Sequence, residues 1–242
     1  MNSQAESHRH HISGQFNAEL EDVKQHMLEM GGLVEKQLND ALAAARKSDS
    51  GLGTRVINAD DDVDSMEMKI DEECNLILAR RHPAASDLRL VLAIIKTVRD
   101  LERIGDESAK VAHMAVKLSE EGNFDIGVVE FGRIGKTVSS MVHMALDAFA
   151  RYDADAALKV AQQDAEVDEE YGSALRSLIT YMMEDRRSIS RVVNLLWSLR
   201  ALERVGDHAK NISEHVIYLV KGMDVRHEDL RDVAEKLVEE DE

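Results

Sequence analysis

The sequence predicts an all-α protein composed of two tandem three-helix bundles related by internal duplication, and three observations predict this fold. The block DLERIGD at residues 100–106 returns as ALERVGD at residues 201–207. A repeat of about a hundred residues is too long for one solenoid unit and indicates a duplicated small domain. The chain of 242 residues contains one proline and only 4% aromatic residues. Helix breakers are therefore rare, and long helices are expected rather than sheets.

The first bundle is predicted over residues 15–122, preceded by a flexible N-terminal tail at residues 1–14. Apolar residues at spacings of three and four indicate a helix that begins near Phe16. The glycine-containing stretch 49–53 interrupts the pattern, and Pro83 separates the next two helices. The three helices of this half are expected at residues 16–46, 54–81 and 86–121.

The second bundle is predicted over residues 127–222, beyond a boundary at the glycine-containing segment 122–127. Asp153 has the residue type of a helix N-cap, and Gly222 is suited to end the last long helix. Trp197, on that otherwise apolar helix, is expected in the core. The three helices are expected at residues 128–151, 154–185 and 188–220, and an acidic tail or short helix at residues 223–242.

The composition argues against several classes of partner. The formal net charge of −17 disfavours binding to nucleic acids, whose affinity depends largely on Lys and Arg side chains that meet phosphates. It also disfavours docking on anionic lipid by charge alone, and no apolar run reaches the ~20 residues that span a bilayer. The polar N-terminus lacks the apolar core of a signal peptide. A cytoplasmic protein is therefore expected, with membrane contact only through partner proteins.

Pairs of acidic residues four positions apart occur in both halves. Residues i and i+4 lie about 40° apart around a helix, so both carboxylates project from one face. A single pair is typical of a solvated helix face, but the duplication favours a metal site, because carboxylate oxygens are preferred ligands of hard divalent cations. The sequence therefore predicts binding of Mn, Mg, Zn or Fe ions by Asp60, Asp64, Glu102, Asp106, Asp164, Asp168, Glu203 and Asp207.

The two predicted metal sites differ in composition. Four residues beyond Asp106 stands Lys110, whose ammonium group could take the place of a cation. Four residues beyond Asp207 stands Asn211, whose amide oxygen is a possible ligand. We therefore expect two sites of unequal affinity.

Signatures of known enzyme classes are missing from the sequence. No histidine has a glutamate three residues before it, as ferritin-like di-iron bundles require. The sequence also has no HExxH motif, no phosphate-cradling glycine-rich loop of the form GxxxxGK[ST], and no GxSxG motif. The single cysteine, Cys74, fits a reducing compartment and is expected to be buried. A non-enzymatic role is favoured, and the alternative is a carboxylate-bridged, metal-dependent hydrolase or oxidase with a water nucleophile at an open coordination position.

Several spaced blocks of the sequence resemble the PhoU family of phosphate-signalling regulators. The two acidic blocks ERIGD and ERVGD carry the resemblance together with ISGQFNAEL at 12–20, ASDLR at 85–89 and YMMED at 181–185. It extends from His11 to about Lys221, and the blocks occur in the order found in the family. PhoU proteins have two three-helix bundles, in agreement with the helices expected above.

The resemblance implies a cytoplasmic negative regulator that couples a high-affinity phosphate ABC importer to a sensor histidine kinase. Family members repress phosphate-starvation genes when phosphate is plentiful and restrain uptake, through contact with the kinase and with the ATPase subunit of the transporter. The acidic motifs of the family bind metals in some members and map onto the eight carboxylates named above. The chain has 11 methionines, which are adaptable at helix–helix surfaces, so a homodimer is expected.

Overall fold

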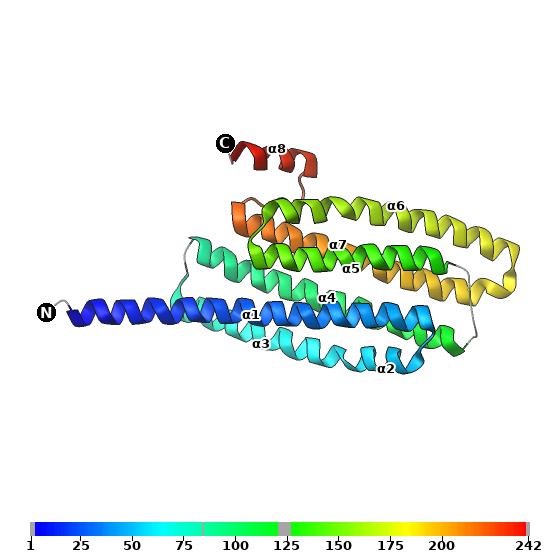
Figure 1. Cartoon of the computed structure of the whole chain (residues 1–242), viewed down its shortest axis with the longest axis horizontal. Helices are drawn as coiled ribbons and strands as arrows, with labels where there is room; N and C mark the ends of the chain where they lie inside the picture. Colours follow the sequence, from blue (N-terminus) through cyan, green and yellow to red (C-terminus); the bar gives the residue numbers. More distant parts are fainter. Residues whose placement is uncertain (1–2, 84, 121–126, 241–242) are drawn as a thin grey trace.

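The computed structural model describes residues 3–83, 85–120 and 127–240, with the side chains of residues 3–13 and 238–240 left undescribed. Within these ranges all regular elements are helices (Figure 1). They are α1 (Ser3–Lys47), α2 (Ser50–Asn58), α3 (Asp60–Arg81), α4 (Ala85–Glu120), α5 (Val128–Arg151), α6 (Ala154–Glu184), the short 3₁₀ helix η1 (Arg186–Ser188), α7 (Ile189–Lys221) and α8 (Leu230–Glu240). The predicted all-α fold is confirmed.

The helices form two bundles that share a core. Helices α1 to α4 contact one another in the first bundle, and α5, α6 and α7 contact one another in the second. Helix α4 lies against α7, and α1 lies against α5, so the two bundles meet along their length (Figure 1). Ile104 of α4 and Leu199 of α7 are both fully buried within one continuous apolar cluster. The duplicated halves therefore stabilise each other through burial of their central helices.

Polar caps and glycine set several helix ends where the sequence indicated. The side chain of Asp153 accepts a hydrogen bond from the backbone N–H of Ala156 at 2.8 Å, so it caps α6 as predicted. Gly222 ends α7 in a left-handed conformation with φ of 74°, which glycine adopts without strain. Asp49 accepts a hydrogen bond from Leu52 N at 2.9 Å and starts α2. The predicted break at residues 49–53 is therefore a cap followed at once by helix.

Two expected elements differ from the structure. The single helix predicted over residues 54–81 is wrong, because the chain forms α2 and α3 with Ala59 between them. Three aspartates at residues 60–62 start α3, where carboxylates interact favourably with the positive end of the helix dipole. The tail expected at residues 1–14 is helical from Ser3 onward, since the segment has no proline and its Ala, Glu, Gln and Arg residues favour helix.

The C-terminal segment of the chain ends in a short helix. Helix α8 forms the short-helix alternative expected in residues 223–242 and packs against α6 (Figure 1). Most of the predicted domain boundary, residues 121–126, lies outside the described residues. No helix in the part of the chain that the structure describes is long and apolar enough to cross a membrane. Cys74 is buried, as expected, and burial raises the pKa of its thiol to about 12.

The prediction that Trp197 lies in the core is wrong. Its side chain is 63% exposed, and Val193 and Ile189, one and two turns earlier on α7, are also exposed. Residues four apart share a helix face, so these three side chains form an uncovered apolar stripe. Met183, at the neighbouring end of α6, is 81% exposed. We call these four residues the distal apolar patch; large exposed apolar patches commonly mark interaction sites.

Candidate metal-binding clusters and the seam between the bundles

The first cluster lies where α3 begins beside the middle of α4. Asp60 accepts a hydrogen bond of 2.9 Å from Gln37 Nε2 of α1. Arg103 on α4 places its Nε 3.1 Å from Glu102 Oε2 and its guanidinium nitrogen 3.0 Å from Asp106 Oδ2. The cluster consists of the predicted residues Asp60, Asp64, Glu102 and Asp106.

The carboxylates of the first cluster act on one another electrostatically. Burial raises the pKa of Asp60, the hydrogen bond from Gln37 opposes this, and the charges of Asp106 and Asp64 raise it further. Burial also raises the pKa of Glu102, and Asp106 adds to the effect while Arg103 opposes it. The pKa values of Asp60 and Glu102 are therefore raised in part by the neighbouring carboxylates, as expected where carboxylates converge.

The second cluster lies at the matching place between α6 and α7. Asp164 is buried and pairs with Lys210, whose Nζ lies 2.8 Å from Asp164 Oδ2. Arg200 forms an ion pair with Glu203 Oε1. The cluster consists of the predicted residues Asp164, Asp168, Glu203 and Asp207.

Glu203 is the most perturbed acid of the second cluster. Its pKa is raised to about 7, mainly by burial and then by the negative charges of Asp207, Asp168 and Asp164, while Arg200 opposes the shift. Burial likewise raises the pKa of Asp207, followed by the charges of Asp164 and Asp168. The structure therefore brings all four predicted acids of this half within electrostatic reach of one another.

A glycine in each repeated block sits against the first aspartate of its cluster. A Cβ atom on Gly105 would lie 3.1 Å from Asp60 Oδ1 and 3.2 Å from Gln37 Oε1. A Cβ atom on Gly206 would lie 3.7 Å from Asp164 Oδ1, an ordinary contact. Gly105 thus lets α3 bring Asp60 closer to α4 than a side chain would allow, whereas the approach of α6 to Gly206 leaves room for a Cβ atom.

Alanine substitution at these two glycines is expected to give unequal results. Alanine favours helix over glycine by about 1 kcal/mol, and Gly206→Ala should retain most of this gain because its contacts remain ordinary. Gly105→Ala should lose it, because Asp60 and Gln37 must move and the hydrogen bond between them is strained. Urea unfolding should show Gly206→Ala to be the more stable variant by about 1 kcal/mol or more. Equal stability of the two variants would contradict the tighter packing of the first cluster.

The residues fit a cation in chemistry, although the carboxylates are not gathered around one point. Within the described ranges, no group of three or more His, Cys, Asp or Glu side chains is arranged to hold a metal ion. Glu203 Oε2 is nevertheless buried without a hydrogen-bond partner, and Glu102 Oε2, at the equivalent position, is buried and receives only an ion pair from Arg103. A buried carboxylate oxygen without a donor is costly, and an oxygen-binding cation would satisfy it.

The basic neighbours of the clusters differ from those expected. Lys110 does not serve the first cluster, because its ammonium group donates to Glu107 Oε1 at 3.0 Å. Asn211 does not face the second cluster, because it donates to Asp100 Oδ1 at 3.1 Å. The ammonium group that enters a cluster is that of Lys210, on α7.

The sequence analysis missed a polar contact in the seam between α4 and α7. The carboxylate of Asp100 on α4 is bonded by His208 Nδ1 at 2.8 Å, by His215 Nε2 at 2.9 Å and by Asn211 Nδ2 at 3.1 Å, all from α7. One signal was visible: Asp100 is the only position of the repeated seven-residue block where the copies differ in charge, since its counterpart is Ala201. His208 and His215 are seven residues apart, a spacing that places both on one face of α7.

Comparison with known proteins agrees with the fold and with the repeat. Residues 27–115 and 131–216 each match the family model described as the PhoU domain. The chain is 62% identical over 228 residues to the phosphate-specific transport system accessory protein PhoU homolog of Pseudomonas aeruginosa, covering 94% of each chain. It is 47% identical over 217 residues to the Escherichia coli accessory protein PhoU, covering 90% of each.

Two solved structures have the same architecture. The crystal structure of PhoU from Pseudomonas aeruginosa aligns with a TM-score of 0.85 at 63% identity, over 86% of this chain and 100% of that chain. The phosphate transport system regulatory protein PhoU from Streptococcus pneumoniae aligns with a TM-score of 0.80 at 32% identity, over 87% of this chain and 99% of that chain. The duplicated helical fold, the two family matches and these relatives together show that the chain belongs to the PhoU family.

Proposed function

We propose that this protein is an accessory regulator of phosphate transport that represses the phosphate-starvation response and limits uptake. It acts as a cytoplasmic adaptor between a sensor histidine kinase and the ATPase subunit of a high-affinity phosphate ABC transporter. The observation that carries the proposal is the 62% identity over 94% of both chains with an accessory protein of a phosphate-specific transport system. An adaptor needs docking surfaces rather than a catalytic constellation, and the absence of enzyme motifs in the sequence supports this role.

The distal apolar patch supplies a surface suited to a protein partner. An exposed Trp side chain brings a large apolar area with few rotatable bonds, and such residues often dominate binding energies at interfaces. Trp197 is 63% exposed at the end of the molecule where α6 and α7 meet. We therefore place at least one of the two partner contacts on this patch.

The adaptor role predicts specific co-purification. The tagged full-length chain should retain the sensor kinase and the transporter ATPase from cells grown in phosphate, and Trp197→Glu should weaken retention of at least one of them. Met68 on α3 is similarly exposed, at 66%, so Met68→Glu is the matched control and should bind as the unaltered chain does. Failure to retain either partner at any phosphate level would reject the adaptor role, whereas retention unaffected by Trp197→Glu would reject only the docking site.

We further propose that each acidic cluster binds a divalent or transition metal ion such as Mn, Mg, Zn or Fe. The support is the repeated set of oxygen donors, together with the Oε2 atom of Glu203, which is buried without a hydrogen-bond partner. The pKa is raised at two acids of each cluster, namely Asp60, Glu102, Glu203 and Asp207. The ion would supply positive charge that relieves carboxylate repulsion and holds α3 to α4 and α6 to α7. The basic residues Arg103, Arg200 and Lys210 now supply part of this charge, so they would have to turn away as the ion binds.

Metal binding is tested by titrating metal-stripped protein with manganese in a calorimeter. The unequal clusters predict two classes of site. A variant with Glu→Gln and Asp→Asn at all eight predicted positions should lose both classes. Exposed acids on other faces, such as Asp22 and Glu169, remain in this variant and control for weak general attraction to a protein of this charge. Equal heats of manganese binding from the two proteins would show that the clusters are solvated helix faces and not metal sites.

We also expect particular classes of partner and a particular oligomeric state. The formal net charge of −17 supports proteins or cations, rather than nucleic acids, as partners. We propose a homodimer, which sedimentation of the chain at micromolar concentration would reveal; a species of monomer mass alone would reject it.

A further inference from the structure

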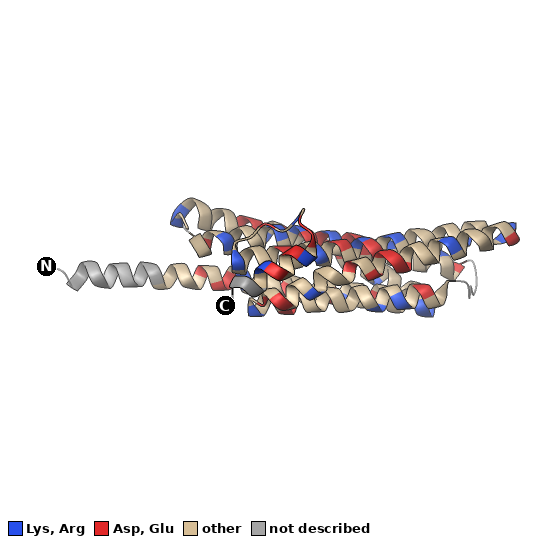
Figure 2. Cartoon of the chain, turned by 90° about the horizontal axis from the view of Figure 1, so that it is seen from above, with Lys and Arg blue, Asp and Glu red and all other residues tan. Residues whose placement is uncertain are grey.

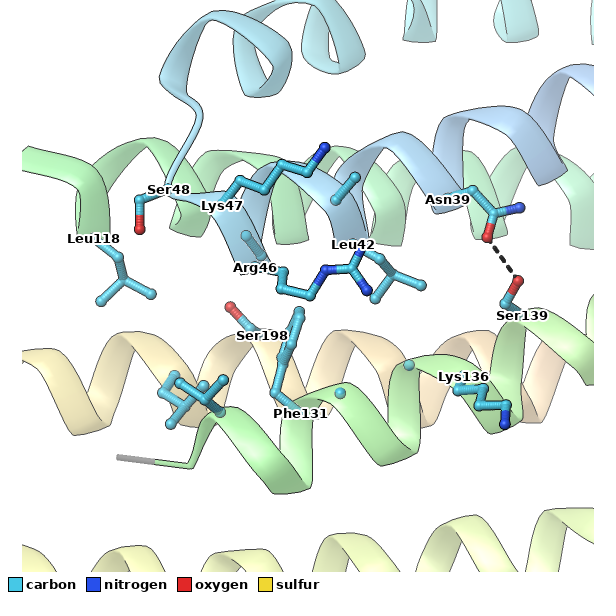
Figure 3. Close-up of a pocket in the computed structure, with 16 residues that line it drawn as sticks. Asn39, Leu42, Arg46, Lys47, Ser48, Leu118, Phe131, Lys136, Ser139 and Ser198 are labelled. Carbon is cyan, nitrogen blue, oxygen red and sulfur yellow. Dashed lines mark hydrogen bonds between the residues drawn. The ribbon is translucent and has the colours of Figure 1, made fainter. Parts of the chain in front are cut away.

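A cavity of about 510 Å³ opens between the C-terminal end of α1 and the N-terminal end of α5, with α7 behind it (Figure 3). This volume lies within the range of small-molecule sites in proteins, about 300–1,000 Å³. Among the described residues that line it, three are basic, namely Arg46, Lys47 and Lys136, and none is Asp, Glu or His. The chain carries 47 acidic residues against 30 basic ones, so a lining with this charge stands apart from the rest of the molecule.

The three cations of the cavity have no anionic partner among the described residues. Their charged groups form no hydrogen bond or ion pair within that part of the chain, although Asp and Glu residues are numerous along the helices (Figure 2). Figure 3 shows the guanidinium of Arg46 lying between α1 and α5 beside Leu42, with the amines of Lys47 and Lys136 turned outward at opposite rims. A guanidinium in such a place is suited to bidentate binding of an anion, and flexible lysines can close over it.

The other walls of the cavity indicate the rest of the ligand. Phe131 presents an aromatic face to the cavity and Leu42 an aliphatic one, while the hydroxyls of Ser139 and Ser198 stand nearby (Figure 3). The first turn of α5 also borders the cavity through Val128, and free N–H groups at a helix N-terminus favour anions. A phosphoryl group carries a charge of about −1.5 to −2 at neutral pH, which matches a three-cation lining better than a single carboxylate does.

We propose that this cavity binds a small organic phosphate, with its phosphoryl group on Arg46, Lys47 and Lys136 and its apolar body against Phe131. The inference is independent of the adaptor and metal proposals, because no residue of the distal apolar patch or of either acidic cluster lines the cavity. Arg46 and Lys47 also stand in the last turn of α1, where cations stabilise a helix whatever they bind. Lys136, in the interior of α5, has no such role and is therefore the more informative position.

Calorimetric titration of the full-length chain with phenyl phosphate, inorganic phosphate and phenol tests the proposal. Phenyl phosphate should bind saturably and about tenfold more tightly than inorganic phosphate, with no binding of phenol, because head group and body both contribute. The double variant Arg46→Gln/Lys136→Gln should bind phenyl phosphate about tenfold more weakly, or weaker still. Lys159→Gln, which removes an exposed charge on α6, is the control and should leave the affinity unchanged.

A second variant tests the location by volume rather than by charge. A Cβ atom on Gly132 would meet nothing within 4 Å, and Gly132 lines the cavity, so Gly132→Leu can fill the space without disturbing the fold. This variant should keep the circular dichroism spectrum of the unaltered chain but should no longer bind phenyl phosphate. The proposal is overturned if phenyl phosphate gives no saturable heat, if inorganic phosphate binds as tightly, or if either the charge variant or Gly132→Leu binds like the unaltered chain.

Discussion

Replacing Asp100 by alanine is expected to lower the free energy of unfolding by about 3 to 4 kcal/mol, the cost of breaking a buried charged network from one side. The substitution leaves the ring nitrogens of His208 and His215 and the amide of Asn211 without the acceptor that they share. His215 is 8% exposed, so water does not readily replace the lost acceptor. The lost hydrogen bonds lie in the seam between α4 and α7, where the two bundles join.

The contribution of Asp100 should depend on pH in a defined direction. Burial alone would raise its pKa, but hydrogen bonds from His208, His215 and Asn211 outweigh this and lower the pKa to about 2. A carboxylate with a depressed pKa stabilises the fold above its unfolded value, near 3.9, and loses this contribution as the pH falls toward the folded value. The difference between Asp100→Ala and the unaltered chain should therefore shrink between about pH 4 and pH 2.

Urea unfolding followed by circular dichroism at pH 7 and at pH 3 measures both effects. Asp22 on α1 is exposed, so Asp22→Ala should change the free energy of unfolding by no more than about 0.5 kcal/mol and serves as the control. A loss at Asp100 as small as that at Asp22, or a loss independent of pH, would mean that the network does not hold the seam together.

Glu203→Gln is expected to stabilise the metal-free protein. Above pH 7 the unaltered Glu203 carries a charge that burial and the neighbouring carboxylates Asp207, Asp168 and Asp164 disfavour. Glutamine has a similar shape without the charge. Allowing for Arg200 beside it and for solvent that screens the cluster, we expect a gain of about 1–2 kcal/mol at pH 8.

The gain from Glu203→Gln should disappear on acidification. The folded protein holds a proton on Glu203 between its unfolded value of 4.5 and its folded pKa of about 7, so the stability of the unaltered chain rises as the pH falls through this window. Thermal unfolding in chelator at pH 8 and pH 5 should show a higher midpoint for the variant only at pH 8. Glu166→Gln, at an exposed position on α6, should leave both midpoints unchanged. A Glu203→Gln variant no more stable than the unaltered chain at pH 8 would contradict the strained state of this acid.

The same substitution should weaken metal binding, so stability and ligand affinity would change in opposite directions. Sites that bind charged ligands commonly hold like charges together at the expense of the unliganded fold. A gain in stability together with unchanged manganese affinity would separate Glu203 from the proposed metal site.

Much of the fold could be predicted because the signals that determine it are local. Apolar spacing, the Asp153 cap and the repeated blocks placed both bundles and most helix ends. The break at Ala59 was missed because no proline or glycine marks it. The three aspartates at 60–62 indicate a helix start only through their favourable interaction with the helix dipole. Trp197 was misplaced because periodicity identifies an apolar face but does not say whether this protein or a partner covers it.

The acidic clusters could be predicted as pairs but not as sites. Helical spacing places Glu203 and Asp207 on one face, yet only packing shows that Lys210 reaches Asp164 across the bundle while Lys110 turns to Glu107. The cavity beside Arg46 had no sequence signal, because its lining comes from segments far apart in the chain.

The single Asp100 has a consequence for how the two halves came to fit. In a symmetric dimer of separate bundles, any change in the seam would occur twice, and a new carboxylate would bring a second one with it. Joining the copies in one chain lifts that restriction. Asp100 of the first repeat meets His208 of the second. At the equivalent positions Ala201 replaces Asp100, and Glu107, bound by Arg204 at 3.3 Å, replaces His208. Covalent linkage thus allowed the halves to become complementary rather than identical, which ties each bundle to its own partner and not to a copy from another molecule.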